Sequence, residues 1–95
     1  MTAQQIWKFE TPFEDKFSIK MPTQSIILCV QQDQKTSIPC IWVLVYPDNP
    51  IEERFFELFG TCNSVNSDMG TSRKYIGTYQ YQKGVFVGHI FERLN

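Results

Sequence analysis

His89 is the only histidine of the chain, and Cys29, Cys40 and Cys62 are its three thiols. A cysteine or serine hydrolase needs a nucleophile beside a histidine that a carboxylate orients. No Gly-x-Ser-x-Gly or comparable segment is present, and Cys29 and Cys40 stand inside apolar runs, which indicates small buried hydrophobes. We therefore expect no catalytic residues and no enzyme. We interpret His89 as a strand residue hydrogen-bonded to a neighbour, with ligand contact and acid–base catalysis as the alternatives.

The sequence has no metal or cofactor signature. It lacks a Cys-x-x-Cys pair, and one histidine with widely spaced cysteines does not match the usual zinc patterns. The adjacent carboxylates Glu14-Asp15 and Glu52-Glu53 are expected on solvated turns. Neither Gly-x-x-x-x-Gly-Lys-Ser/Thr nor Gly-x-Gly-x-x-Gly occurs, so no nucleotide-binding loop is predicted. We expect no metal site and no cofactor.

The aromatic and basic residues predict a binding site instead. Aromatic residues make up 15% of the chain. Tyr75, Tyr79 and Tyr81 alternate and are expected to share one face of a strand, with Arg73 and Lys74 at its start. Tyrosine rings beside Arg and Lys can hold a planar anionic ligand by stacking and charge-assisted hydrogen bonds. The alternative is that these rings pack in the core and that both cations are solvated.

The elements that must position these residues are strands. The apolar runs are short, rich in Val, Ile, Phe, Tyr and Trp, and separated by Pro, Gly, Asn or Asp, which is typical of strands and turns. The run over 25–31 is continuously apolar and is expected to be buried on both faces. A polar loop is expected over 61–72. The predicted strands are 6–10, 17–21, 25–31, 39–46 and a final hairpin within 74–92.

Residues 51–59 fit two structures. Pro50 followed by two glutamates suits the start of a helix. A strand with Phe56 and Leu58 on one side also fits, and we favour it because Phe-Phe suits a helix poorly and Gly60 ends the run early.

These elements predict an all-β, mostly antiparallel fold. We expect a small β-meander barrel or sandwich of about six or seven strands with at most one short helix. Gly84 can supply the positive φ of the turn near 82–84. Gly77 and Gly88, inside strands, indicate a bulge, a bend or a close approach. The 95 residues are expected to form one domain, 1–95.

Charge and hydrophobicity along the chain limit the classes of partner and the cellular compartment that we expect. The formal net charge is −1, whereas a domain that binds duplex nucleic acid should be basic. The start MTAQQIWKFE has no basic region followed by an apolar block, so we expect no signal peptide. The longest apolar run, 38–46, is shorter than the roughly 20 residues that a spanning helix needs. We expect a cytoplasmic protein with free thiols and no membrane contact.

Several short blocks carry a resemblance. IWKFE, KMP, IILCVQQ, PCIWVLVYPDNP, FFELFGT, KYIGTYQ and GVFVGHIFE follow in this order over most of the chain. In these blocks the chain resembles a family of small uncharacterised proteins of phages, prophages and bacterial genomes. The family has a Gly-His-Pro-like segment soon after its Gly-Thr pair, where this chain has Cys62-Asn63-Ser64, so no histidine role carries over there. The His-Ile-Phe-Glu end matches, at His89 to Glu92.

The resemblance implies a phage-type accessory anti-defence protein that acts by binding, in the host cytoplasm where a phage encodes it. The expected ligand is a small anionic nucleotide-like signalling molecule, sequestered by a homo-oligomer. Aromatic rings would stack on it, cations would hold phosphate, and loop residues would supply hydrogen bonds. The expected ligand-binding residues are Trp7, Asn63, Ser64, Asn66, Arg73, Lys74, Tyr75, Tyr79 and His89.

The alternative is a protein–protein inhibitor or assembly module. It would bind a host or phage protein, such as a host defence protein, through an aromatic patch or an edge strand. Such a module should co-purify with a polypeptide and show no rise in melting temperature with small molecules.

Overall fold

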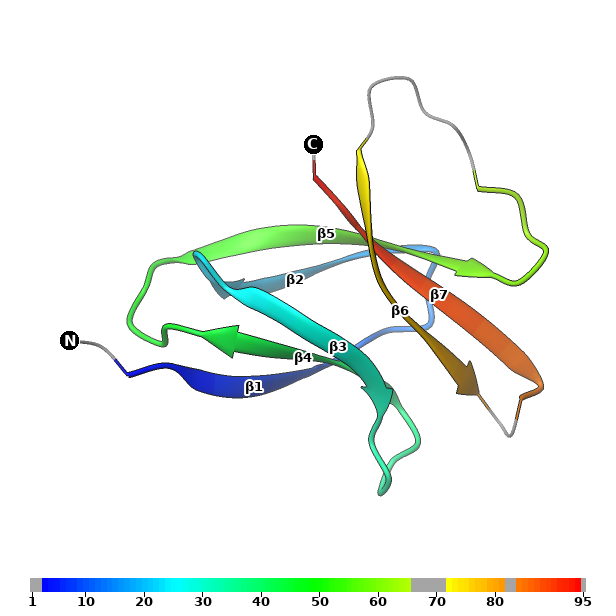
Figure 1. Ribbon diagram of the computed structural model, residues 1–95, viewed down its shortest axis with the longest axis horizontal. Helices are drawn as coiled ribbons and strands as arrows, with labels where there is room; N and C mark the ends of the chain where they lie inside the picture. The colour runs from blue at the N-terminus through cyan, green and yellow to red at the C-terminus, as the bar shows by residue number, and fades with distance from the viewer. Residues whose placement is uncertain (1–2, 66–71, 82–83, 95) are drawn as a thin grey trace.

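Short alternating segments fold into strands throughout the described part of the chain (Figure 1). The computed structural model describes residues 3–65, 72–81 and 84–94. Within them there is no helix, and therefore none that could cross a membrane. The predicted all-β fold is confirmed, and residues 51–59 belong to a strand. The seven strands are β1 (Gln5–Glu10), β2 (Lys16–Pro22), β3 (Ile26–Gln32), β4 (Pro39–Val45), β5 (Ile51–Gly60), β6 (Arg73–Tyr81) and β7 (Phe86–Arg93).

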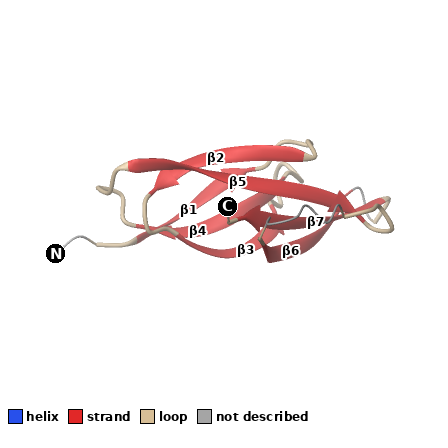
Figure 2. Cartoon of the chain, turned by 90° about the horizontal axis from the view of Figure 1, so that it is seen from above, coloured by secondary structure: helices blue, strands red, loops and turns tan. Residues whose placement is uncertain are grey.

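The strands form two antiparallel sheets. One has the order β1-β4-β3 and the other the order β2-β5-β7-β6. In Figure 2, β2 lies above β1 and β4, as one layer of a sandwich over the other. Only β3–β4 and β6–β7 pair as neighbours in sequence, so the predicted meander is limited to these two hairpins. The crossings between sheets let the apolar face of each sheet cover the other.

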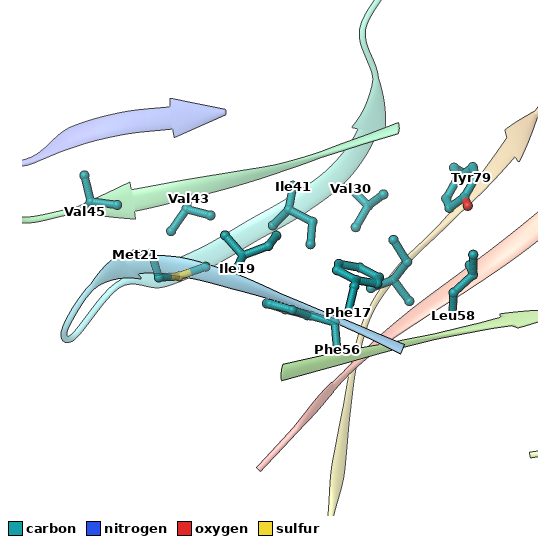
Figure 3. Close-up of a cluster of buried hydrophobic side chains, with 11 residues drawn as sticks. Phe17, Ile19, Met21, Val30, Ile41, Val43, Val45, Phe56, Leu58 and Tyr79 are labelled. Carbon is teal, nitrogen blue, oxygen red and sulfur yellow. The ribbon is translucent and has the colours of Figure 1, made fainter. Parts of the chain in front are cut away.

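The core lies between the two sheets (Figure 3). β2 alternates between exposed and buried residues, as its sequence Phe-Ser-Ile-Lys-Met predicts. The Phe17 and Phe56 rings stack with their centroids 5.4 Å apart. The buried apolar cluster consists of Phe17, Ile19, Met21, Val30, Ile41, Val43, Val45, Phe56, Leu58, Tyr79 and Ile90.

The edge strands β3 and β6 contact each other and close one side of the sandwich. Gly77 permits this approach, because a Cβ there would lie 3.1 Å from the Cβ of Val30. Gly88 has a similar role beneath the Tyr79 ring, 2.7 Å from the position of its missing Cβ. Of the three alternatives for these glycines, a bulge, a bend or a close approach, the structure shows a close approach at both and a bulge just before Gly77. Gly84 has a φ of +90°, as predicted for its turn.

A bulge in β6 changes which tyrosines share a face. Tyr75 pairs with Phe91, but Gly77 pairs with Ile90, so one residue is extra between them. A one-residue shift moves every later side chain to the opposite face. Tyr75 is 54% exposed on the outer face, whereas Tyr79 is 5% exposed in the core. The prediction that Tyr75, Tyr79 and Tyr81 share one face is wrong for this reason.

β3 differs from its prediction as well. Its continuous apolar run was expected to be buried on both faces, but Ile26 is 53% exposed and Leu28 is 48% exposed. β3 is an edge strand, and only its inner face, which includes Val30, joins the core. The outer face of the three-stranded sheet is therefore apolar and exposed at this end.

Candidate functional site

The outer face of the four-stranded sheet carries aromatic, basic and hydroxyl side chains, carboxylates and the histidine. The registers align side chains of four strands in rows across it: Ser18, Phe55, Arg93 and Arg73 form one row, and Lys16, Glu57, Phe91 and Tyr75 the next. A third row continues with Phe59, His89 and Thr78. We call this surface the aromatic face; it comprises Lys16, Ser18, Phe55, Glu57, Phe59, Arg73, Tyr75, Thr78, His89, Phe91 and Arg93.

Four aromatic rings run across this face. Phe91 lies in the middle, with edge contacts to Phe59 and Tyr75 at centroid distances of 5.8 and 5.4 Å. Phe55 and Tyr75 are 51% and 54% exposed. Strands β5, β7 and β6 fix the rings, because the residues on one side of each strand face the same way. The result is a preformed aromatic surface of the kind that is enriched in interfaces.

A carboxylate is enclosed among the rings. Glu57 is 3% exposed although it points away from the core. The Arg73 Nε donates to its Oε1 at 2.6 Å, and Nη1 of Arg93 lies 3.9 Å from its Oε2. The Arg73 guanidinium also lies 5.7 Å from the centroid of the Phe59 ring. These contacts hold the two arginines and the aromatic rings in one rigid arrangement.

Two hollows open on the aromatic face. The larger, of about 420 Å³, is lined by Lys16, Ser18, Phe55 and Arg93 above the ring pair Phe17–Phe56. The smaller, of about 230 Å³, lies between Lys16, Glu57 and Phe59 and the loop residues after β5. The volume of the larger hollow falls in the usual range of ligand pockets. Lys16, at the start of the edge strand β2, lines both hollows, and in the smaller hollow it faces the carboxylates of Asp15 and Glu57.

His89 is held by hydroxyl groups on both sides. Its Nε2 is 2.8 Å from Thr61 Oγ1, and its Nδ1 is 2.8 Å from Thr78 Oγ1, which in turn is 2.5 Å from the Tyr75 hydroxyl. Either neutral tautomer satisfies all three bonds, because the hydroxyl groups of Thr61, Thr78 and Tyr75 can each donate or accept. The histidine therefore positions Tyr75 and the end of β5 relative to each other.

The thiols take no part in this arrangement. Cys40 is buried, and burial raises the pKa of its thiol. Cys29 is only half-buried, whereas the sequence predicts that it is buried. Cys62 is exposed in the turn after β5 and has a positive φ of 71°. All three are free. Among the described residues, no three His, Cys, Asp or Glu side chains converge on a possible metal site.

The structure brings some of the expected ligand-binding residues together. Arg73, Tyr75 and His89 all belong to the aromatic face. Asn63 and Ser64 line the smaller hollow at its border. Five of the expected residues therefore meet on or beside one surface.

The other expected residues lie elsewhere. Trp7 is on β1 of the three-stranded sheet, where its Nε1 donates to Gln5 Oε1 at 2.9 Å. Tyr79 is in the core, and burial raises the pKa of its hydroxyl. Lys74 is exposed on β6 opposite Glu92, on the side away from Tyr75. Asn66 lies outside the described residues. The expected stacking of Trp7, Tyr75 and Tyr79 on one ligand is not possible in this arrangement.

Sequence reasoning did not single out most of the aromatic face. The missed residues carried a usable signal, since Phe-x-Glu-x-Phe at 55–59 and His-x-Phe-x-Arg at 89–93 alternate at the period of a strand. What the sequence did not give is the pairing of these two strands. That pairing places the missed residues in one patch: Lys16, Phe55, Glu57, Phe59, Phe91 and Arg93.

Two packed antiparallel sheets define a small β-sandwich, and the outer face of one sheet carries the aromatic face. The chain belongs to the family described as a domain of unknown function, DUF7352, whose model matches residues 2–95. Searches of curated proteins and of solved structures gave no significant match.

Proposed function

We propose that this chain is a non-catalytic binding protein that recognises another protein through its aromatic face. The observation that carries the proposal is the pair of half-exposed rings, Phe55 and Tyr75, on the two strands that flank the strand of Phe91. Tyrosine and arginine, both present on this face, are among the residues that most often dominate binding energy at protein interfaces.

The charges of this surface indicate the chemistry of the partner. The outward-pointing positions of the four strands carry the cations Lys16, Lys20, Arg73 and Arg93 but only the carboxylates Glu53 and Glu57. The surface therefore has an excess of positive charge on a chain whose net charge is −1. A partner segment that presents carboxylates around apolar or aromatic side chains complements it.

Capture from cells that naturally contain the protein tests this proposal. Tagged wild-type protein should retain a polypeptide that mass spectrometry identifies. Phe55→Glu and Tyr75→Glu should each reduce its recovery by at least about tenfold. Each variant removes an aromatic ring from the interface and adds a carboxylate that repels the carboxylates of the partner.

Val85→Glu is the matched control. Val85 is 80% exposed in the turn before β7 and is not one of the residues of the aromatic face, so this variant should retain the partner. A partner that both Phe55→Glu and Tyr75→Glu retain would contradict the proposal. So would the absence of any captured polypeptide.

The larger hollow favours a second candidate, a small anionic ligand. Its volume of about 420 Å³ and its two cations, Lys16 and Arg93, suit a nucleotide-sized anion. A panel of linear and cyclic nucleotides should then raise the melting temperature of the wild type, and Lys16→Glu should abolish the rise. A flat response to the panel removes this candidate and leaves the protein partner.

The role in countering a host defence, and the host cytoplasm as its place, stay predictions from the resemblance. They fit either candidate, because inhibition by a small binding protein needs only occupancy of a partner or capture of a messenger. The identity of the captured molecule tests them directly.

A further inference from the structure

The outer face of the three-stranded sheet carries an apolar row that spans all three strands. Ile6 on β1 and Ile26 on β3 both lie directly opposite Leu44 on the central strand β4. Ile6 is 62% exposed, Ile26 is 53% exposed, and Leu28 beside them is 48% exposed. Strand residues at such positions are normally polar when the face is solvated. We call this row and Leu28 the isoleucine face.

The chain exposes more surface than a compact monomer of its mass, which leaves area available for an interface. The accessible surface is 6412 Å², whereas a monomer of 11.2 kDa is expected to expose roughly 5,700 Å². The excess of about 700 Å² is close to the ~800 Å² that each partner buries in a standard interface. It reflects a thin molecule, whose extents are 45 × 39 × 16 Å.

We propose that two copies of this chain pack through their isoleucine faces around a two-fold axis that runs along β4. This axis lays Ile6 of one copy on Ile26 of the other and Leu44 on Leu44, because the two isoleucines flank Leu44 on opposite sides. A two-fold interface must be self-complementary in this way.

Charge supports the same axis. Glu10 and Gln31 both lie opposite Cys40, on either side of β4, in a row of this sheet face that is separated from the isoleucine row by the row of Lys8, Trp42 and Cys29. Rotation about β4 therefore lays the Glu10 carboxylate on the Gln31 amide of the partner copy and not on a second carboxylate. The amide can donate to the carboxylate, so the polar rim of the interface is complementary as well.

Light scattering and sedimentation of the whole chain test the proposal. The wild type should have twice the mass of one 11.2 kDa chain. Ile6→Lys and Ile26→Glu should each be monomeric, because each buries a charge against an isoleucine. An equimolar mixture of the two variants should recover the dimer mass, since the axis lays the introduced lysine on the introduced glutamate.

Ile51→Glu is the matched control, since Ile51 is 59% exposed but lies on the other sheet, and this variant should keep the dimer mass. Thermal unfolding confirms that each variant is folded, and the reversed pair Ile6→Glu with Ile26→Lys replaces a variant that is not. A monomeric wild type, a dimer that persists in both single variants, or a dimer lost in Ile51→Glu overturns the proposal. A mixture that stays monomeric overturns the axis.

Discussion

Glu57 and Arg73 organise the aromatic face at the level of single residues. Glu57 points outward yet is enclosed by rings and by two arginines, so its charge is taken out of water and neutralised at 2.6 Å by Arg73. The arginine expected to hold a ligand phosphate is thus part of the scaffold. A buried ion pair contributes little by its presence, but removing one partner leaves an uncompensated charge.

Arg73→Ala should therefore destabilise the fold. We expect a loss on the order of 3 kcal/mol in the free energy of unfolding, because Arg93 at 3.9 Å compensates Glu57 only in part. Chemical denaturation measures it. Arg73→Met should lose a similar amount of stability. The double variant Arg73→Met with Glu57→Leu should recover most of that loss, because it no longer buries an unpaired carboxylate.

The neighbouring Lys74→Ala serves as control, because Lys74 is exposed and its removal should change stability by less than about 0.5 kcal/mol. An Arg73→Ala protein as stable as the wild type would show that the Glu57 carboxylate has no need of this arginine.

At the level of elements, Asp33 fixes the β3–β4 hairpin. Its Oδ1 accepts from the backbone N–H of Lys35 at 2.7 Å and of Thr36 at 3.3 Å, and its Oδ2 accepts from the Lys8 ammonium of β1. The Lys8 bond first, and then the two N–H groups, lower the pKa of Asp33 from 3.8 to about 2. The Asp33 carboxylate thus connects β1, at one edge of the three-stranded sheet, to the turn between β3 and β4.

A lowered pKa gives the sign of the pH dependence. The contribution of Asp33 to stability is complete above its ordinary pKa near 4 and is lost as the pH falls through about 2. Asp33→Asn removes this charge but keeps an oxygen that can accept from the two N–H groups. Its melting temperature should therefore fall less than that of the wild type between pH 4 and pH 2. Parallel curves for the two proteins would contradict this.

At the scale of the whole molecule, the two proposed surfaces lie on opposite sides of the sandwich. The aromatic face is on the outside of one sheet and the isoleucine face on the outside of the other. The proposed dimer would therefore present two aromatic faces outward, separated by roughly twice the 16 Å thickness of one copy. Two linked sites strengthen attachment to a surface that carries many copies of a partner.

The two surfaces should act independently. Phe55→Glu should lose the captured partner and keep the dimer mass. Ile26→Glu should bind the free partner with unchanged affinity, but dissociate at least about tenfold faster from an immobilised partner because avidity is lost. Surface plasmon resonance in both orientations measures this. A loss of dimer in Phe55→Glu would show that the surfaces are coupled.

The sequence by itself determined the strands. Alternation in Phe-Ser-Ile-Lys-Met, the prolines that flank 48–49 and the glycine at 84 are local signals, and the structure has strands and turns where they predict them. Strand formation depends on the alternation of apolar and polar side chains, and this alternation can be recognised within a few residues. The choice of strand over helix for 51–59, which rested on the Phe-Phe pair and on Gly60, was also correct.

Only the tertiary structure decided which strands pair and which face each residue occupies. The bulge before Gly77 separates Tyr75 from Tyr79, and the pairing of β5 with β7 brings Phe55 and Phe59 onto the same face as Phe91, although they are far apart in the sequence. The continuous apolar run of β3 predicts burial on both faces, but β3 lies at the edge of its sheet and is buried on one face only. Register and sheet order depend on contacts between segments far apart in the chain, and these leave no local mark in the sequence.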